Sequence, residues 1–265
     1  MPLRTPTLPP ATHTNTYLIG QRALVVVDPA TPHRKEQAKL EALLDARLAA
    51  GARLRCLFLT HHHMDHVGHV VRLRKRYGVP VVGHALTREL LAPTIPVDDL
   101  LDEGDLIELD DGPWKVLHTP GHATGHLCLL NGTGDLICGD MVAGEGTIVL
   151  DPPQGDLGHY LASLSRLRDL QPSCLHPAHG PAIPAAVEKL QEYIDHRNLR
   201  TGQVRAALAK LGSARPRQLV PIIYPDLHLL ARPIAARQML CHLQWLAGRG
   251  EVSTLRGRFS LAETP

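Results

Sequence analysis

Residues 60–66 read Thr-His-His-His-Met-Asp-His and place four imidazoles and one carboxylate within seven positions. They follow a short apolar run, residues 54–60, which predicts a buried β-strand. Because side chains alternate along an extended chain, we expect His61 and His63 on one side and His62 on the other. This arrangement indicates a metal site rather than a packing pattern.

A helix is expected directly after the histidine cluster. Residues 65–73 carry apolar side chains at helical spacing, so Asp65 and His66 should open a helix beside the same site. Ligands would then converge from both sides of one turn. The alternative is that these are ordinary surface or core histidines, since the chain contains 17 of them.

The spacing His-x-His-x-Asp-His at residues 61–66 resembles the signature of the metallo-β-lactamase superfamily. Three further motifs resemble those of the same family, and each follows a predicted strand: Thr-Pro-Gly-His at 119–122, Gly-Asp at 139–140 and Pro-Ala-His-Gly at 177–180. Four motifs in the expected order make ordinary histidines a poor explanation. The resemblance implies an α/β fold, the αβ/βα sandwich of this superfamily, with helices on both outer faces.

The resemblance also implies a binuclear centre of two zinc ions, with Mn²⁺ or Fe²⁺ as alternatives. One ion would be held by His61, His63 and His122, the other by Asp65, His66 and His179, and Asp140 would bridge both. A metal-bridging hydroxide would be the nucleophile, because zinc lowers the pKa of bound water from roughly 15.7 to about 7. Asp65 is the catalytic residue in this scheme, since it would bind and orient at the second ion.

Several other histidines are expected to support the ligands or to be solvated: His62, His69, His84, His118, His126, His159 and His176. Three residues depart from the family pattern. His69 stands where the family commonly has Gly, Ala123 where it has Thr or Ser, and Ala178 where it has Gly. None of these changes removes a ligand, so we expect them to alter the shape of the pocket.

Length and composition favour an enzyme with one large and one small domain. We expect a catalytic domain at residues 1–194 and a linker helix with a winged-helix-like domain at residues 195–265. No signal segment or apolar run of membrane-spanning length is seen, which predicts a cytoplasmic protein that does not contact membranes. The five cysteines are odd in number and lack a C-x-x-C motif, so we expect them to be reduced.

Charge is unevenly distributed along the chain. Residues 195–265 hold 11 Lys and Arg against 4 Asp and Glu, a net charge of +7, whereas the first 194 residues have a net charge of −5. The expected elements at 216–223, 234–246 and 251–261 are helix, helix and hairpin, an order that resembles a winged helix. The alternative is a module that caps the catalytic domain or forms a homodimer.

Residues 139–147 and 193–200, together with the winged helix, resemble the β-lactamase-like protein 2 branch of the superfamily. Its animal members are single-stranded RNA endonucleases, whereas fungal relatives are thioesterases. We therefore expect an endoribonuclease that binds single-stranded RNA, with a thioester, lactone or β-lactam hydrolase of small acyl substrates as the alternative. A nucleic-acid-binding module without catalysis is a third possibility, which the complete ligand set disfavours. Few aromatic residues, chiefly Tyr224 and Trp245, are present to stack bases.

Overall fold

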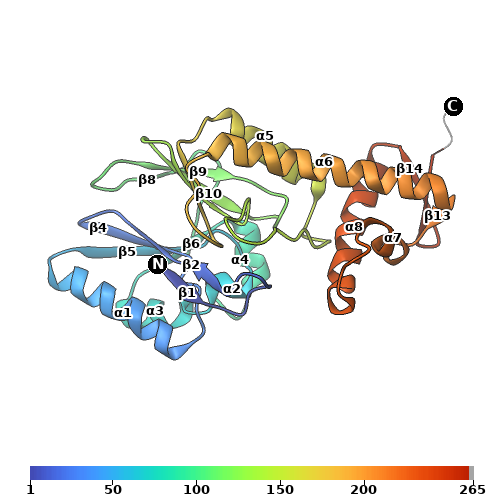
Figure 1. Cartoon of the computed structure of the whole chain (residues 1–265). Helices are drawn as coiled ribbons and strands as arrows, with labels where there is room; N and C mark the ends of the chain where they lie inside the picture. The colour runs from blue at the N-terminus through green and yellow to red at the C-terminus, as the bar shows by residue number, and fades with distance from the viewer. Residues whose placement is uncertain (263–265) are drawn as a thin grey trace.

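Two five-stranded β-sheets lie face to face in the larger part of the chain, as the computed structural model of residues 1–262 shows (Figure 1). The first sheet has the order β3-β4-β5-β6-β7: Tyr17–Ile19, Ala23–Val27, Arg53–Phe58, Val81–Gly83 and Asp99–Leu100. The second has the order β12-β11-β10-β9-β8: Cys174–Pro177, Asp135–Gly139, Leu127–Asn131, Trp114–His118 and Leu106–Ile107. A separate antiparallel pair is formed by β1 and β2: Pro2–Arg4 and His13–Asn15.

Helices cover the outer face of each sheet. The helices on and around the first sheet are α1 (Arg34–Ala49), α2 (Met64–Val67), α3 (Val70–Tyr77) and α4 (Ala85–Leu91). The second sheet is covered by α5 (Leu157–Asp169) and the first half of α6 (Ala186–Leu211). The predicted αβ/βα sandwich is confirmed.

Alternation along the strands accounts for these layers. In β4, Val25 and Val27 belong to the core between the two sheets, whereas Val26 belongs to the core under α1 and α3. The second sheet behaves in the same way, because Val116 of β9 faces the other sheet and Leu117 faces α5 and α6. Each sheet is therefore apolar on both faces, as a sandwich with helices outside requires.

The helix expected after the histidine cluster is present but interrupted. It is divided into α2 and α3 because Gly68 donates its N–H to the carbonyl of Ala30 (3.1 Å) and His69 donates its N–H to that of Pro29 (2.8 Å). A Cβ added to Gly68 would lie 2.6 Å from the oxygen of Ala30. A close approach between distant backbones therefore requires glycine here.

The C-terminal part is a winged helix. Its elements are α7 (Pro216–Ile223), η1 (Leu229–Ala231), α8 (Arg232–Gly248), β13 (Ser213–Ala214), β14 (Val252–Leu255) and β15 (Arg258–Leu261). The predicted order of helix, helix and hairpin is confirmed, with β13 added as a third strand beside β15. Its core joins the two helices to the wing through Leu219, Met239 and Phe259.

Helix α6 contributes to both parts of the molecule. Ala186, Leu190 and Ile194 pack in the core of the second sheet, whereas Val204 and Leu208 pack in the core of the winged helix. The division expected between residues 194 and 195 falls inside this helix, and it stays a prediction. Neither α6 nor any other helix within residues 1–262 has the length and apolar character needed to cross a bilayer.

The cysteines are free thiols, as predicted: Cys56, Cys128, Cys138, Cys174 and Cys241. Cys128, Cys138 and Cys241 are buried. Burial raises the pKa of Cys128 to about 12, so this thiol is protonated and unreactive at neutral pH. The three buried cysteines pack as small apolar side chains, whereas Cys56 and Cys174 are half-buried.

Candidate metal centre

Four strands from the two sheets deliver the predicted site residues to one place. The site residues follow the strand ends directly: His61 and His63 after β5, His122 after β9, Asp140 after β11 and His179 after β12. The turn before Asp140 depends on Gly139, which has a φ of +49°. A Cβ there would lie 2.6 Å from Nε2 of His126, so only glycine fits between the strand and the site.

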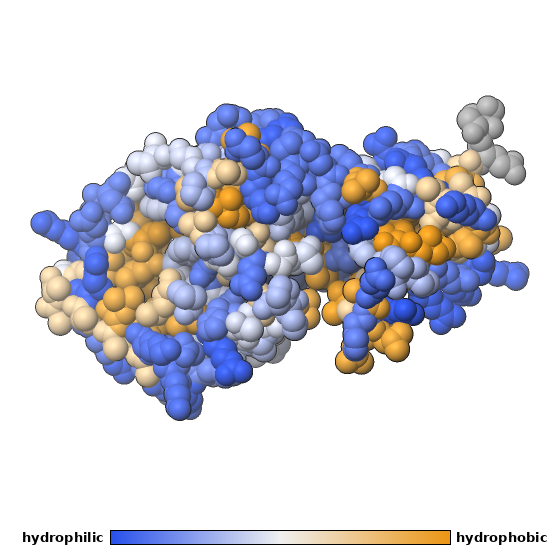
Figure 2. Space-filling view, in the orientation of Figure 1, coloured by the Kyte–Doolittle hydropathy of each residue, from blue (hydrophilic) through white to orange (hydrophobic). Residues whose placement is uncertain are grey.

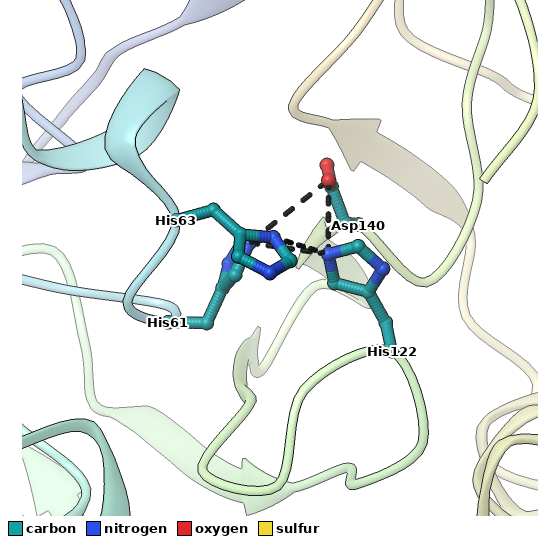
Figure 3. A group of neighbouring side chains, drawn as sticks. All are labelled: His61, His63, His122 and Asp140. Carbon is teal, nitrogen blue, oxygen red and sulfur yellow. Dashed lines mark hydrogen bonds and ion pairs between the residues drawn. The ribbon is translucent and has the colours of Figure 1, made fainter. Parts of the chain in front are cut away.

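His61, His63, His122 and Asp140 form the first group of converging side chains (Figure 3). Nε2 of His61 lies 2.9 Å from Nδ1 of His63 and 3.2 Å from Nε2 of His122. Nε2 of His122 is also 2.9 Å from Nδ1 of His63 and 3.3 Å from Oδ2 of Asp140. Three imidazole nitrogens and a carboxylate oxygen therefore point at one small volume.

Asp65, His66 and His179 form the second group, on the other side of Asp140. Oδ1 of Asp140 lies 3.6 Å from Nε2 of His66 and 3.4 Å from Nε2 of His179. Asp65 completes the group, with Oδ2 3.6 Å from Nε2 of His179. The two oxygens of Asp140 thus face different groups, which is the arrangement that a bridging carboxylate requires.

Hydrogen bonds at the far ring nitrogens leave the inward nitrogens as acceptors. His122 donates from Nδ1 to the carbonyl of Val149 (2.9 Å), and His179 donates from Nδ1 to that of His13 (3.0 Å). Each Nε2 then carries a lone pair directed into the site. Such contacts orient metal-binding imidazoles and fix their tautomer.

Asp28, at the end of β4, organises the remaining ligands and was missed by sequence reasoning. Its carboxylate accepts hydrogen bonds from the backbone N–H of Thr60 (2.8 Å), from Oγ1 of Thr60 (2.6 Å) and from Nδ1 of His66 (2.8 Å). Thr60 Oγ1 in turn accepts a hydrogen bond from Nδ1 of His61 (2.9 Å). Asp28 is buried and holds a φ of +48°, a backbone conformation that is uncommon for residues other than glycine.

The donor set fits a pair of metal ions. Nε2 of His66 and Oδ1 of Asp140 are buried and have no hydrogen-bond partner among residues 1–262, which is costly unless a cation satisfies them. Burial lowers the pKa of His61 far below its usual value and that of His122 to about 3, so both rings are neutral and able to bind a metal. Burial opposes protonation of His66, but the carboxylates of Asp140 and Asp65 raise its pKa overall. The His66 ring therefore lies in a region of concentrated negative charge.

Other histidines are arranged around the centre in different ways. His62 belongs to neither group. It lines a hollow beside Leu90 and Ile95, outside the cavity over Asp140, and its ring lies against that of His63 (centroids 4.6 Å apart). His126 is buried and accepts a hydrogen bond at Nε2 from the backbone N–H of Asp140 (3.1 Å), so it supports the bridging residue. His69, at a position where the family commonly has Gly, is buried away from the site.

The buried His69 bonds to Glu41 of α1 through Nε2 (3.0 Å). Hydrogen bonds from Arg72, opposed by burial and aided by His69, lower the pKa of Glu41 to about 2. This carboxylate is therefore charged at neutral pH, and the three residues fasten α1 to α3. His69 has a structural role rather than one at the rim of the pocket.

The remaining histidines singled out in the sequence lie apart from both groups. His84 and His118 stack with ring centroids 4.3 Å apart, His176 contacts Asp135 (2.9 Å), and His159 is exposed on α5. Cys174 lies beside Asp135 and His176. None of these residues contacts the side chains that converge on Asp140 within residues 1–262.

A cavity of about 290 Å³ opens over Asp65, His122 and Asp140. Its walls come from the N-terminal segment, from residues 145–151 and from α8: Pro6, Thr7, Leu8, Ala11, Glu145, Gly146, Thr147, Ile148, Val149, Asp151, Ile234 and Arg237. No sequence pattern indicated these walls, because their residues are distant from the metal motifs and lack a pattern of their own. The winged helix therefore forms part of the pocket.

Comparison with known families agrees with this architecture. The sequence pattern described as the metallo-beta-lactamase superfamily matches residues 9–179. The pattern described as the beta-lactamase associated winged helix domain matches residues 216–258. The two matched segments coincide with the sandwich and the C-terminal module.

Two relatives illustrate the range of similar proteins. A Drosophila melanogaster protein named beta-lactamase-like protein 2 homolog is 30% identical over 255 residues, which cover 90% of this chain and 84% of the relative. An Aspergillus fumigatus protein named atrochrysone carboxyl ACP thioesterase is 31% identical over 202 residues, which cover 75% of this chain and 60% of the relative. The first similarity extends into the winged helix.

Two solved structures resemble the chain. A beta-lactamase domain protein from Burkholderia ambifaria is 22% identical, with a TM-score of 0.88 over 99% of this chain and 90% of that one. A second structure, of a di-iron-bound form, is 32% identical, with a TM-score of 0.56 over 71% of this chain and 96% of that one. The former shares the fold of nearly the whole chain, whereas the latter shares that of about 71% of it.

Proposed function

The chain belongs to the metallo-β-lactamase superfamily, whose members are generally hydrolases, and on that premise we propose that it hydrolyses the thioester or ester bond of an acyl substrate. Two divalent metal ions would be held by the seven converging residues: His61, His63, Asp65, His66, His122, Asp140 and His179. Zinc is the expected metal, and the similarity to a di-iron-bound structure supports iron as the alternative.

The character of the pocket wall is the observation that favours an acyl substrate. Beyond the seven residues, Leu8, Ile148 and Ile234 and their neighbours make the wall mainly apolar. The charged groups of the wall are Glu145, Asp151 and Arg237, and this arginine is paired with Asp151. A polynucleotide needs free cations along its path, because neutralised phosphates supply most of the non-specific affinity. This wall offers more negative than positive charge.

Bound metal ions would supply Lewis acidity and hydroxide at neutral pH. The chain's own residues prepare the site for them: buried His61 and His122 stay neutral, and Asp140 directs one oxygen into each group. The apolar wall would hold the acyl group above Asp140 and keep bulk water from the rest of the substrate. A relative named as a thioesterase supports the same class of reaction.

A side-by-side assay tests this proposal. Zinc-loaded protein and its Asp140→Ala variant would be assayed on butanoyl thioester, on a chromogenic β-lactam and on unstructured RNA. We expect the thioester to be hydrolysed with the highest kcat/KM and the activity to disappear in the variant. Cleavage of RNA together with inert acyl substrates would contradict the proposal.

Cleavage of single-stranded RNA is a second candidate, supported by the charge of the winged helix. Arg215, Arg217 and Arg256 are exposed and form no ion pair with a carboxylate within residues 1–262, whereas Arg205 and Arg249 are paired with Glu251. The three exposed arginines could bind phosphates. They do not line the cavity over Asp140, so RNA would have to reach the centre across other surfaces.

A further inference from the structure

An apolar groove of about 480 Å³ lies beside the cavity of the metal centre. One wall is formed by the N-terminal segment and by residues 147–149, and the other by the winged helix. The winged-helix side is mainly apolar: Tyr224, Leu227, Leu230, Ala231, Ile234 and Ala235. In Figure 2 apolar surface gathers at the lower tip of the winged helix, where Figure 1 shows one end of α8.

The groove and the cavity of the metal centre share part of their walls. Five residues line both: Leu8, Thr147, Ile148, Val149 and Ile234. Val149 also accepts the hydrogen bond from the ligand residue His122 (2.9 Å). A substrate whose reacting bond lies over Asp140 would therefore extend directly from the ligands into the groove.

Buried Arg197 fixes the two walls of the groove relative to each other. From α6 it donates to the carbonyl of Ile148 (2.6 Å) and to Oε1 of Gln238 in α8 (3.2 Å). In the wall of the neighbouring cavity, Arg237 of α8 contacts Asp151 and the carbonyl of Pro152. The groove is therefore a preformed feature of the joined domains.

Resting on the acyl-hydrolase function proposed above, we propose that this groove binds the aliphatic chain of the substrate, with the scissile carbonyl at the metal centre. The walls that the groove shares with the cavity, and their apolar character, carry this assignment. Leu230, which lines the groove, is 82% exposed, and its neighbour Leu229 is 68% exposed, so the two form a small apolar surface beside the groove. An alkyl chain that leaves the cavity would cover Leu230.

The chain-length dependence of hydrolysis measures this contact. Each methylene that enters the groove should lower KM by up to about fourfold, which corresponds to ~0.8 kcal/mol per buried CH₂. We would compare thioesters from butanoyl to dodecanoyl with the metal-loaded full-length protein. KM should fall until the groove is filled, while kcat changes much less, because the added contacts are the same in the ground and transition states.

Two substitutions place a charge in the groove. Leu230→Asp changes an exposed side chain, and Ile234→Asp lies in the first turn of α8, where an acidic residue favours the helix. Both proteins should fold, and circular dichroism would check this. Their KM values should rise more for decanoyl than for butanoyl thioester, so that the dependence on chain length becomes shallow.

Leu255→Asp is the matched control, because Leu255 is 75% exposed on β14 of the same winged helix but does not line the groove. This variant should keep the chain-length dependence of the wild type. A wild-type enzyme that hydrolyses all chain lengths with the same KM would overturn the groove assignment while leaving the proposed function in place. Equal losses in Leu230→Asp and Leu255→Asp would also overturn it.

Direct binding separates the two proposals. If no thioester is hydrolysed, the acyl-hydrolase function fails, and calorimetry with decanoate then decides the groove alone. Binding with a negative heat-capacity change that is lost in Ile234→Asp would support an apolar chain in the groove. Absence of binding would overturn it, as would a dimer that dissociates in Leu230→Asp, since a second copy would then cover this surface.

Discussion

The winged helix has two unlike faces. Toward the metal centre it presents Leu230, Ile234 and Ala235, whereas away from it Arg215, Arg217 and Arg256 are exposed near the wing. In Figure 1 the strands β13 and β14 lie at the end of the molecule farther from the two sheets, and α8 lies nearer to them. One module thus offers an apolar surface to the pocket and a basic surface to solvent.

This difference shows what a net charge along the sequence leaves undetermined. The net charge of +7 after residue 194 favours a polyanion as partner. In three dimensions Arg197 holds two walls together, Arg205 and Arg249 are paired with Glu251, and Arg237 is paired with Asp151. Arg215, Arg217 and Arg256 form no ion pair with a carboxylate within residues 1–262, and they do not line the cavity over Asp140.

The largest effect should come from removing the centre that both faces would serve. Asp140→Ala takes away the carboxylate whose oxygens face the two groups of ligands. We expect the bound metal to fall from two ions to one or fewer and hydrolysis of any substrate to drop about a thousandfold or more, because metal ions contribute several kcal/mol of charge stabilisation. Metal analysis with kinetics measures both, and Asp111→Asn, at an exposed position outside the groups of possible metal ligands among residues 1–262, is the control. Unchanged metal content would refute the bridging role.

Asp65 and His62 provide a second test on the catalytic side. Asp65 contacts His179 at the second group, whereas His62 lines a hollow outside the cavity over Asp140. We expect Asp65→Ala to lower kcat/KM about a hundredfold, since removing one group that orients the reaction commonly has this effect, and His62→Ala to change it by less than about twofold. An inactive His62→Ala beside an active Asp65→Ala would overturn the alternation on which the ligand assignment rests.

Asp28→Asn should lower the metal affinity of the same centre, because Asp28 supports the ligands without binding the metal. The carboxylate orients His66 and Thr60, and loss of such a partner typically costs about 10-fold to 100-fold in metal affinity. Competition with a chelator measures the affinity, and circular dichroism checks the fold. If acyl substrates and RNA use one centre, both activities should fall together. A loss confined to one substrate would mean that the two faces serve different chemistry.

The smallest effect should come from the basic face. If RNA binds there, the double change Arg215→Gln and Arg217→Gln should remove two phosphate contacts. Each contact contributes roughly 0.7 to the slope of log affinity against log salt concentration, so the slope should become shallower by about 1.4. Hydrolysis of a butanoyl thioester should be unaffected, because neither arginine lines the cavity. Arg249→Gln, which removes an arginine already paired with Glu251, is the matched control. An unchanged salt dependence would remove the support for RNA.

The positions brought together at the centre were predictable because each is tied to a local pattern. Alternation along the strand that ends before His61 separates His61 and His63 from His62, and the helical spacing that follows places His66 nearby. Each motif also follows an apolar strand, and strands that end at one edge deliver their next residues to one place. Local patterns therefore placed each residue after a strand, whereas the meeting of His122, Asp140 and His179 with the histidine cluster was implied by the resemblance to the superfamily.

The supporting residues were not predictable, because they act across the fold. Asp28 lies 32 positions before Thr60 and has an ordinary sequence context, yet it orients two parts of the site. The interruption at Gly68 depends on a contact with Ala30. The pocket walls join Leu8 to Ile234, residues that no periodicity connects. Such features appear only when the strands, loops and winged helix are assembled.

The continuous helix α6 makes the two domains a single mechanical body. Its 26 residues span about 39 Å at 1.5 Å per residue, and its two ends are embedded in different cores. A rotation of the winged helix relative to the catalytic domain would have to bend α6 or unpack one of its ends from the core that surrounds it. The groove should therefore keep its width as substrates come and go, and a cut at residue 194 would expose apolar surface on both fragments.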